Sequence, residues 1–202
     1  CIRDRVRWID INKGDDENVE YRSRLVAKEI KMDKREDLFA ATPPLEAKKI
    51  LFSLAMTQGK NKLKPSKLDF IDIKRAYFHA KARRDVYVQL PDEDYQEGMC
   101  GKLVKSMYGT RDAAQNWESE YTEFLLEIGM TQGVSNPCVF YHQAKDIRLV
   151  IHGDDLTVLA EEEQLDWLRA KVAAKFEVKF RARLGPEQKD DKAVMMLNRV
   201  VE

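Results

Sequence analysis

Residues 149–159 read LVIHGDDLTVL, two apolar runs separated by Gly153, Asp154 and Asp155. The runs have the length and β-branched content of strands, and Gly and Asp favour tight hairpin turns. The pattern predicts a core hairpin with two adjacent carboxylates at its tip. Burying two like charges side by side is costly unless cations neutralise them. This stretch alone leaves open whether the pair is a metal site or a simple turn.

A second acid stands at the end of another apolar strand. Residues 67–73 read KLDFIDI, with Asp72 next to the last position. If this strand neighbours the hairpin, Asp72, Asp154 and Asp155 converge, and carboxylate oxygens are what hard divalent ions require. Two Mg²⁺ ions about 3.5–4 Å apart would stabilise the attacking and leaving oxygens of a phosphoryl displacement. We therefore predict a two-metal site, with Asp72 and Asp154 as the main ligands and Asp155 completing the charge.

Other acids and motifs support less chemistry. The pairs Asp15-Asp16 and Asp190-Asp191 lie in polar, turn-like segments, where we expect solvated charge. His152 precedes the central pair and is expected to pack beside it. No P-loop, dinucleotide-binding, hydrolase-elbow or zinc-protease motif occurs in the sequence.

The composition indicates a globular protein with no membrane segment. Hydrophobic residues make up 44% of the chain and charged residues 35%. No apolar run approaches the roughly 18 residues of a membrane helix, and the start has no signal-peptide pattern. The three cysteines have no metal-binding spacing and fit a reducing compartment. The chain opens on Cys1, so we expect an internal piece of a longer product.

The net charge is zero, but the charge is unevenly distributed. Residues 60–84 contain nine Lys and Arg residues and two Asp, whereas residues 85–101 contain five acids and no base. Phosphate binding depends on a local basic face rather than on the total charge. The charge pattern leaves a nucleic-acid-binding face and a solvated loop as equal alternatives.

The order of predicted elements indicates an α+β fold. Helical periodicity and a Pro43-Pro44 start predict a helix over 45–58, and a second helix is clearest over 111–128. A third helix is expected around 165–172. Strands are predicted at the remaining apolar stretches: 3–11, 19–28, 67–73, 86–90, 138–142, 148–160 (interrupted at 153–155), 176–181 and 193–201. The result is a mostly antiparallel sheet covered by helices.

Several ordered runs resemble one family. They are YRSRLVAK (21–28), LDFIDIKRAYFHA (68–80), VYVQLP (86–91), KLVKSMYGTRDAAQNW (102–117) and VIHGDD (150–155). In this order they resemble the reverse transcriptase of copia-type LTR retrotransposons, over roughly residues 5 to 180. The resemblance implies the fingers and palm of a right-hand polymerase, with an antiparallel palm sheet backed by helices. It implies a fingers-like part at 1–66, a palm at 67–181, and the start of a truncated extension at 182–202.

The resemblance also implies roles for individual residues. Asp72, Asp154 and Asp155 match the catalytic, metal-binding aspartates of the palm. Tyr77, five residues after Asp72, matches an aromatic that excludes a 2′-OH; its alternative is a core aromatic beside Phe78. The implied nucleotide-binding residues are Arg22, Arg24, Lys28, Tyr77, Tyr108 and Gly109. Nucleic-acid binding is expected of Lys74, Arg75 and Arg111, and core packing of Trp117, Tyr121 and Phe124.

The chain departs from the family pattern at two places. His152 and Gly153 stand where an aromatic and a bulky residue usually precede the paired aspartates, which puts the packing under the site in doubt. Ala113-Ala114 replaces the usual Ala-Pro step after Gly109. A chain that stops at Glu202 would lack the thumb and is expected to hold primer–template poorly.

The resulting prediction is an RNA-directed DNA polymerase fragment, a nucleotidyltransferase that uses Mg²⁺, with Mn²⁺ as a substitute, and dNTPs. Its expected partners are a primed RNA or DNA template and the integrase and RNase H of a polyprotein, with no membrane. The expected location is a cytoplasmic virus-like particle or the nucleus. Two alternatives are an inactive transposon remnant that at most binds nucleic acid, and an RNA-dependent RNA polymerase. Tyr77 disfavours the last.

Overall fold

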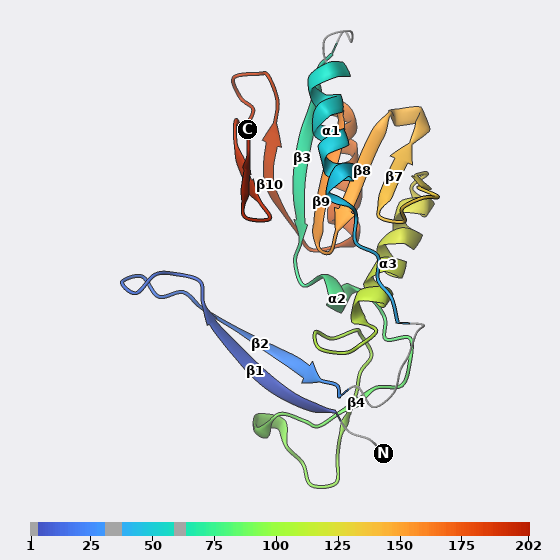
Figure 1. The fold of residues 1–202 in the computed structure, drawn as a ribbon. Helices are drawn as coiled ribbons and strands as arrows, with labels where there is room; N and C mark the ends of the chain where they lie inside the picture. The colour runs from blue at the N-terminus through green and yellow to red at the C-terminus, as the bar shows by residue number, and fades with distance from the viewer. Residues whose placement is uncertain (1–3, 31–37, 59–63) are drawn as a thin grey trace. The chain divides into compact units, whose positions relative to one another are not determined.

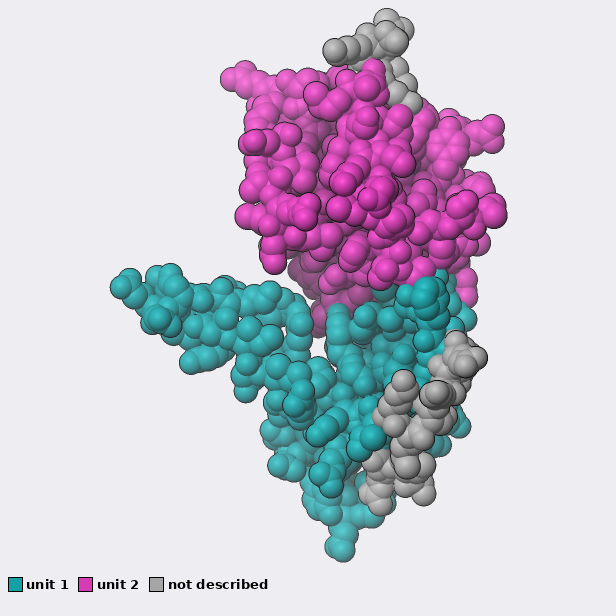
Figure 2. All heavy atoms as spheres, viewed as in Figure 1, with its two compact units in different colours: residues 1–40, 77–120 teal, residues 41–76, 121–202 magenta. Residues whose placement is uncertain are grey.

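The computed structural model describes residues 4–30, 38–58 and 64–202. The chain forms two compact units, coloured separately in Figure 2. Unit 1 comprises Cys1–Ala40 and Tyr77–Glu120, and unit 2 comprises Ala41–Ala76 and Tyr121–Glu202. Among the described residues, none of the helices combines the length and apolar character that a membrane crossing needs.

A six-stranded antiparallel sheet is the centre of unit 2, with strand order β10-β3-β9-β8-β7-β6 (Figure 1). The central strands are buried and mostly apolar, as expected of strands covered on both sides; their buried polar side chains include Lys67 and Asp69 of β3 and Thr157 of β9. The strands are β3 (Ser66–Ile73), β6 (Thr131–Gln132), β7 (Val139–His142), β8 (Ile147–His152), β9 (Asp155–Glu161) and β10 (Val178–Leu184).

Helix α1 (Leu45–Gln58) covers one face of this sheet. It follows Pro44, whose carbonyl accepts a hydrogen bond from Ala47 N, and Pro is tolerated in this first turn. Leu51 of α1 joins a core cluster with Phe70 of β3 and Leu159 of β9. A small hairpin, β11 (Val194–Met196) and β12 (Arg199–Val201), adds Met196 to the same cluster.

Helix α4 (Glu162–Lys175) covers the opposite face of the sheet. It contacts Asp69 of β3, whereas α1 packs on Phe70, and successive strand residues point to opposite faces. Its first turn carries Glu162 and Glu163 and its last turn Lys175. This distribution complements the helix dipole. Arg169 of α4 pairs with Asp69, which neighbours Phe70 in β3. Helix α3 (Ala113–Glu127) begins in unit 1 and ends in unit 2.

Unit 1 is built around a long two-stranded ribbon, β1 (Arg5–Asn12) and β2 (Tyr21–Lys28) (Figure 1). A short pair, β4 (Tyr87–Val88) and β5 (Gly101–Lys102), lies near its base. Ala27, Val86, Val88 and Met107 form a small buried cluster there. The single-turn helix α2 (Ala76–His79) begins in unit 2 and ends in unit 1.

The predicted α+β class with an antiparallel sheet and covering helices is confirmed. The predicted single strand at 193–201 is wrong. Leu197 and Asn198 both have positive φ, 47° and 59°, and turn the chain into the β11–β12 hairpin. Of the strand predicted at 86–90, only Tyr87–Val88 forms a strand, which is β4. The right-hand arrangement and the division at 1–66, 67–181 and 182–202 stay predictions.

Candidate active site

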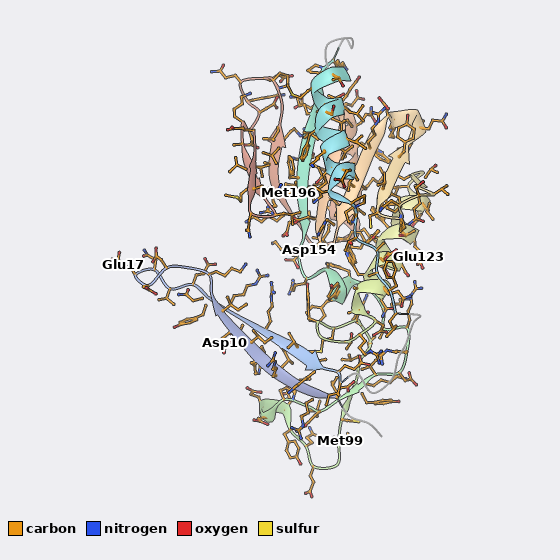
Figure 3. The ribbon with its side chains drawn as sticks, in the orientation of Figure 1. Asp10, Glu17, Met99, Glu123, Asp154 and Met196 are labelled. Carbon is orange, nitrogen blue, oxygen red and sulfur yellow. The ribbon has the colours of Figure 1, made fainter. Side chains whose placement is uncertain are left out.

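The paired aspartates lie at a tight turn between β8 and β9. His152 pairs with Asp155, so Gly153 and Asp154 form a two-residue loop. Gly153 has φ of +64° and Asp154 is not in the positive-φ region, which is the pattern of a type II′ turn. Ile73 N donates a hydrogen bond to Asp154 O at 2.9 Å. The backbone at residues 153 and 154 is therefore a tight hairpin turn, as one of the two alternatives predicted. This turn places both carboxylates at the end of the sheet, where Figure 3 labels Asp154.

Asp72 and Asp155 are direct cross-strand partners on β3 and β9. Lys179 on β10 pairs with Asp72 on the other side, and His152 pairs with Asp155. Opposite residues in an antiparallel pair place their side chains on the same face. The sheet therefore carries a row of Lys179, Asp72, Asp155 and His152 across four strands, with Asp154 exposed in the adjoining turn.

The donor chemistry of this rim fits hard divalent ions, because three carboxylates come from two neighbouring strands and their turn. The side chains as they stand do not complete such a site. Among the described residues, no three Asp, Glu, His or Cys side chains converge closely enough to hold a metal ion. Asp155 is bound to a cation from within the chain.

That cation is Arg181 of β10. Its Nη1 lies 3.1 Å from Asp155 Oδ1, and its Nη2 donates to Met195 O at 3.3 Å. Sequence reasoning missed Arg181, because nothing in the local pattern joins residue 181 to residue 155.

Lys48 of α1 adds a second positive charge on this side of the sheet. Its side chain is 2% exposed, and its Nζ lies 3.8 Å from Met196 Sδ. Burial lowers the pKa of Lys48, and the charge of Asp155 partly opposes that shift. Burial and then Lys48 lower the pKa of His152, against the opposite effects of Asp155 and Asp154. His152 is thus favoured in its neutral form, which agrees with a packing role.

The opposite face of β3 is held by a buried ion cluster. Asp69 is fully buried and accepts two hydrogen bonds from Arg169 of α4 and two from Arg183 of β10. This clamp ties β3, β10 and α4 together three residues before Asp72, so it supports the strand that carries the candidate ligand.

The expectation of solvated charge at Asp190 is wrong. Asp190 is 7% exposed and its Oδ1 lies 2.8 Å from Nζ of Lys67, which is 1% exposed. Glu162 Oε2 lies 3.1 Å from the same Nζ. Burial by itself would raise the pKa of Asp190, but Lys67 outweighs it and the pKa is lowered. A buried lysine requires such partners, and the local sequence around residue 190 does not show them.

Three predicted nucleotide-binding residues gather in unit 1. The rings of Tyr77 and Tyr108 lie with centroids 4.6 Å apart, and Phe78 meets Tyr108 edge-on at 5.5 Å. The Arg24 guanidinium lies 5.8 Å from the centroid of the Tyr108 ring, within cation–π range. Tyr77 is half-buried, so it is both packed against an aromatic and partly accessible.

Gly109 allows the Tyr108 loop to lie directly on β2. Its φ is +91°, and a Cβ at this position would lie 1.8 Å from Ala27 O. Ala27 N donates to Tyr108 O at 2.7 Å. Only glycine fits this close approach, so the resemblance-based assignment of residues 108 and 109 coincides with a structural requirement.

Arg22, Arg24 and Lys28 lie on the same face of the β1–β2 ribbon. Arg24 pairs with Ile9, Arg22 with Ile11 and Lys28 with Arg5, and the remaining pair on this face is Arg7 with Val26. The face therefore holds five cations and no acid, all five exposed. Sequence reasoning missed Arg5 and Arg7. The sequence shows Arg5 and Arg7 two residues apart, so they share a face of β1. It does not show the register that places that face beside the cations of β2.

The three predicted nucleic-acid contacts have partners within the chain. Lys74 and Arg75 both pair with Glu177, and Arg75 has φ of +55°. Arg111 N donates to Glu29 Oε2 at 2.8 Å. Arg84 bridges the same Glu29 to the buried Asp112, and this bridge lowers the pKa of Asp112 although burial opposes it.

The aromatic residues assigned to packing are confirmed in that role. Trp117, Tyr121 and Phe124 are 2%, 5% and 6% exposed. Of the nine cations in residues 60–84, Lys60 and Lys62 lie outside the described residues.

Comparisons with known proteins agree with the family suggested by the ordered motifs. A family model described as "Reverse transcriptase (RNA-dependent DNA polymerase)" matches residues 4–187. The chain is similar to the retrovirus-related Pol polyprotein from transposon TNT 1-94 of Nicotiana tabacum, 25% identical over 91% of the chain. It is 27% identical, over 79% of the chain, to the Pol polyprotein from transposon RE1 of Arabidopsis thaliana. It is 26% identical, over 46% of the chain, to the truncated transposon Ty1-A Gag-Pol polyprotein of Saccharomyces cerevisiae.

These relatives are much longer than the region they share with this chain. The chain spans 14% of the length of the tobacco polyprotein, 11% of the Arabidopsis one and 8% of the yeast one. The matched family region covers nearly the whole chain, including all three aspartates. The chain therefore belongs to the reverse transcriptase (RNA-dependent DNA polymerase) family, in its copia-type transposon branch.

Proposed function

We propose that the chain supplies the fingers and palm of an RNA- and DNA-templated DNA polymerase. In this proposal residues 1–66 are fingers-like, residues 67–181 are the palm, and residues 182–202 begin a further region. The observation that carries it is the cross-strand pair Asp72 and Asp155, with Asp154 in the adjoining turn. A primer 3′-OH would attack the α-phosphate of a dNTP, and pyrophosphate would leave.

Catalysis in this proposal depends on positioning and charge neutralisation. Asp72 and Asp154 would hold Mg²⁺ or Mn²⁺, and Asp155 adds charge at the same rim. The bound ions would supply stabilisation of the attacking and leaving oxygens. The hydrogen bond from Ile73 N to Asp154 O holds the turn against β3, so the two donors keep their spacing.

Residues other than the three aspartates would handle the nucleotide and the template. The five-cation face of the β1–β2 ribbon, which includes Arg22, Arg24 and Lys28, suits the triphosphate. Tyr77, packed on Tyr108, would exclude a 2′-OH. Lys74, Arg75 and Arg111 would contact the template–primer backbone, where phosphates would compete with Glu177 for the first two.

The natural setting would be a retrotransposon polyprotein, with integrase and RNase H outside this chain and a cytoplasmic particle or the nucleus as its location. The relatives from tobacco and Arabidopsis are named as Pol polyproteins, which supports that setting.

Primer extension on poly(rA)/oligo(dT) tests the function, using the chain extended with the downstream sequence of its element. We expect Mg²⁺-dependent incorporation that Asp154→Asn abolishes and that Asp16→Asn, in the ribbon turn, leaves intact. Equal extension by the Asp154→Asn variant would refute the assignment. Absence of extension by the parent would favour the inactive remnant. Incorporation of rNTPs by Tyr77→Ala, but not by the parent, would support the sugar-selecting role.

A further inference from the structure

Arg84 joins two buried carboxylates in unit 1. Its Nη2 donates hydrogen bonds to Glu29 Oε2 and, at 2.9 Å, to Asp112 Oδ1. The Glu29 and Asp112 side chains are 10% and 7% exposed, and that of Arg84 is 27% exposed. Two like charges in such surroundings need a cation between them. Arg84 supplies that cation, and a single nitrogen makes both contacts.

The bridge connects the end of the β1–β2 ribbon to the start of α3. Glu29 directly follows β2, and Asp112 directly precedes α3. Glu29 Oε2 also accepts a hydrogen bond from Arg111 N at 2.8 Å. Asp112 Oδ2 accepts one from Asn116 Nδ2 at 3.0 Å, and Asn116 is 4% exposed. Each carboxylate therefore binds two partners, which fixes residues 111 and 112 against both β2 and α3.

The loop that ends at this bridge carries Tyr108. Tyr108 O accepts a hydrogen bond from Ala27 N at 2.7 Å, and Gly109 lies directly against Ala27 O. The loop is thus attached to β2 at both of its ends, through Ala27 at one end and Glu29 at the other. The centroids of the Tyr108 and Tyr77 rings are 4.6 Å apart. A shift at either attachment would therefore move Tyr108 relative to Tyr77.

An aromatic ring excludes a 2′-OH by steric overlap, so it discriminates only while it is held in place. We propose that Arg84 is a positioning residue that, through Glu29 and Asp112, holds Tyr108 against Tyr77 and thereby sets the preference for dNTP over rNTP. This inference rests on the proposed function. It extends sugar selection from the Tyr77 ring to the ion-paired loop that packs on it.

The test compares incorporation of dTTP and UTP on poly(rA)/oligo(dT), using the chain extended with the downstream sequence of its element. Arg84→Met should lower the ratio of kcat/KM for dTTP to that for UTP by about tenfold or more, because a displacement of about 1 Å can cost about 100-fold. The loss for dTTP should appear mainly in KM, because Arg84 acts on a nucleotide-binding loop. Arg84→Lys should stay within about threefold of the parent, since a lysine Nζ has three donors and can replace the one nitrogen that binds both carboxylates.

A double-mutant cycle separates positioning from general destabilisation. In a Tyr108→Ala background, Arg84→Met should change the ratio by less than about twofold, because the residue that Arg84 positions is then absent. Asp112→Asn is a milder variant that weakens one arm of the bridge, and it should lower the ratio in the same direction. The matched control is Lys102→Met, which removes a cation from the exposed pair with Asp85 in the same unit. It should leave the ratio unchanged.

Hydrogen exchange of the 202-residue chain measures the loop directly. Peptides covering 108–112 should exchange about tenfold faster in Arg84→Met than in the parent, because the acceptor of Arg111 N is then no longer held by Arg84. Lys102→Met should leave the exchange of these peptides unchanged.

Three results would overturn the inference. The first is a parental dNTP preference in Arg84→Met, and the second is unchanged exchange of the loop in that variant. The third is an equal loss of preference when Arg84→Met is made in the Tyr108→Ala background, which would show that Arg84 acts independently of Tyr108. Failure of the proposed function looks different, because the parent would then show no extension, or Tyr77→Ala would keep the parental preference. In that case the exchange of the loop alone decides whether Arg84 holds it.

Discussion

Substitution of Asp69 by alanine should destabilise unit 2 more than any change to an exposed ion pair. Asp69 is buried and accepts hydrogen bonds from Arg169 at 2.6 and 2.9 Å and from Arg183 at 2.7 and 2.9 Å. Breaking a buried ion pair by removing one partner costs about 3–5 kcal/mol. The Arg169 side chain is 25% exposed and can regain water. We therefore expect the lower part of that range, about 3 kcal/mol.

Urea unfolding followed by far-UV circular dichroism measures this change, and hydrogen exchange of β3 and β10 peptides localises it to unit 2. A loss of about 3 kcal/mol corresponds to a decrease of about 6–12 °C in Tm for a chain of this size. The matched control is Asp85→Ala, whose partner Lys102 and own side chain are 55% and 68% exposed. That variant should lose less than about 1 kcal/mol. An Asp69→Ala variant as stable as the control would refute the reasoning.

Three further predictions concern other parts of the chain. Gly109→Ala should cost more than about 3 kcal/mol, because φ is positive and the Cβ would overlap Ala27 O. Gly153→Ala has open space around it and should cost only about 1–2 kcal/mol; equal losses in thermal unfolding would contradict this contrast. Asp190→Asn should cost about 1–3 kcal/mol at pH 7. The folded pKa of Asp190 lies below 3.8, so its contribution is present above pH 3.8 and lost as the pH falls through the folded value. Urea midpoints of variant and parent should therefore converge on acidification, and a constant difference would argue against the pair with Lys67. Arg84→Met should cost about 3 kcal/mol, because Glu29 and Asp112 lose the cation that bridges them; an unchanged Tm would show that this bridge adds no stability.

The sequence predicted the parts of the fold that depend on neighbouring residues. Apolar runs on both sides of Gly153-Asp154-Asp155 predicted the β8–β9 hairpin, and helical periodicity predicted α1 and α3. The same local patterns failed at residues 193–201, where two adjacent positive φ values at Leu197 and Asn198 produce a hairpin. Asn198 tolerates positive φ and favours turns, but Leu197 does not, and the apolar residues on both sides of the pair favoured one continuous strand.

The three aspartates themselves were found from the sequence, because each stands at the end of an apolar strand and the ordered motifs match one family. Strand alternation and turn chemistry act over a few residues, and they are enough to place Asp72, Asp154 and Asp155 at strand ends. That these ends meet in register, Asp72 opposite Asp155, is a property of the sheet order.

Only the tertiary structure decided what surrounds those aspartates. Arg181 is 26 residues from Asp155, and Lys67 is 123 residues from Asp190. Such pairs form because a side chain that becomes buried must find a partner wherever the fold brings one. No local pattern carries that information. The sequence therefore determined that Asp154 and Asp155 lie at the tip of a hairpin, whereas the tertiary structure decided that Arg181 binds Asp155.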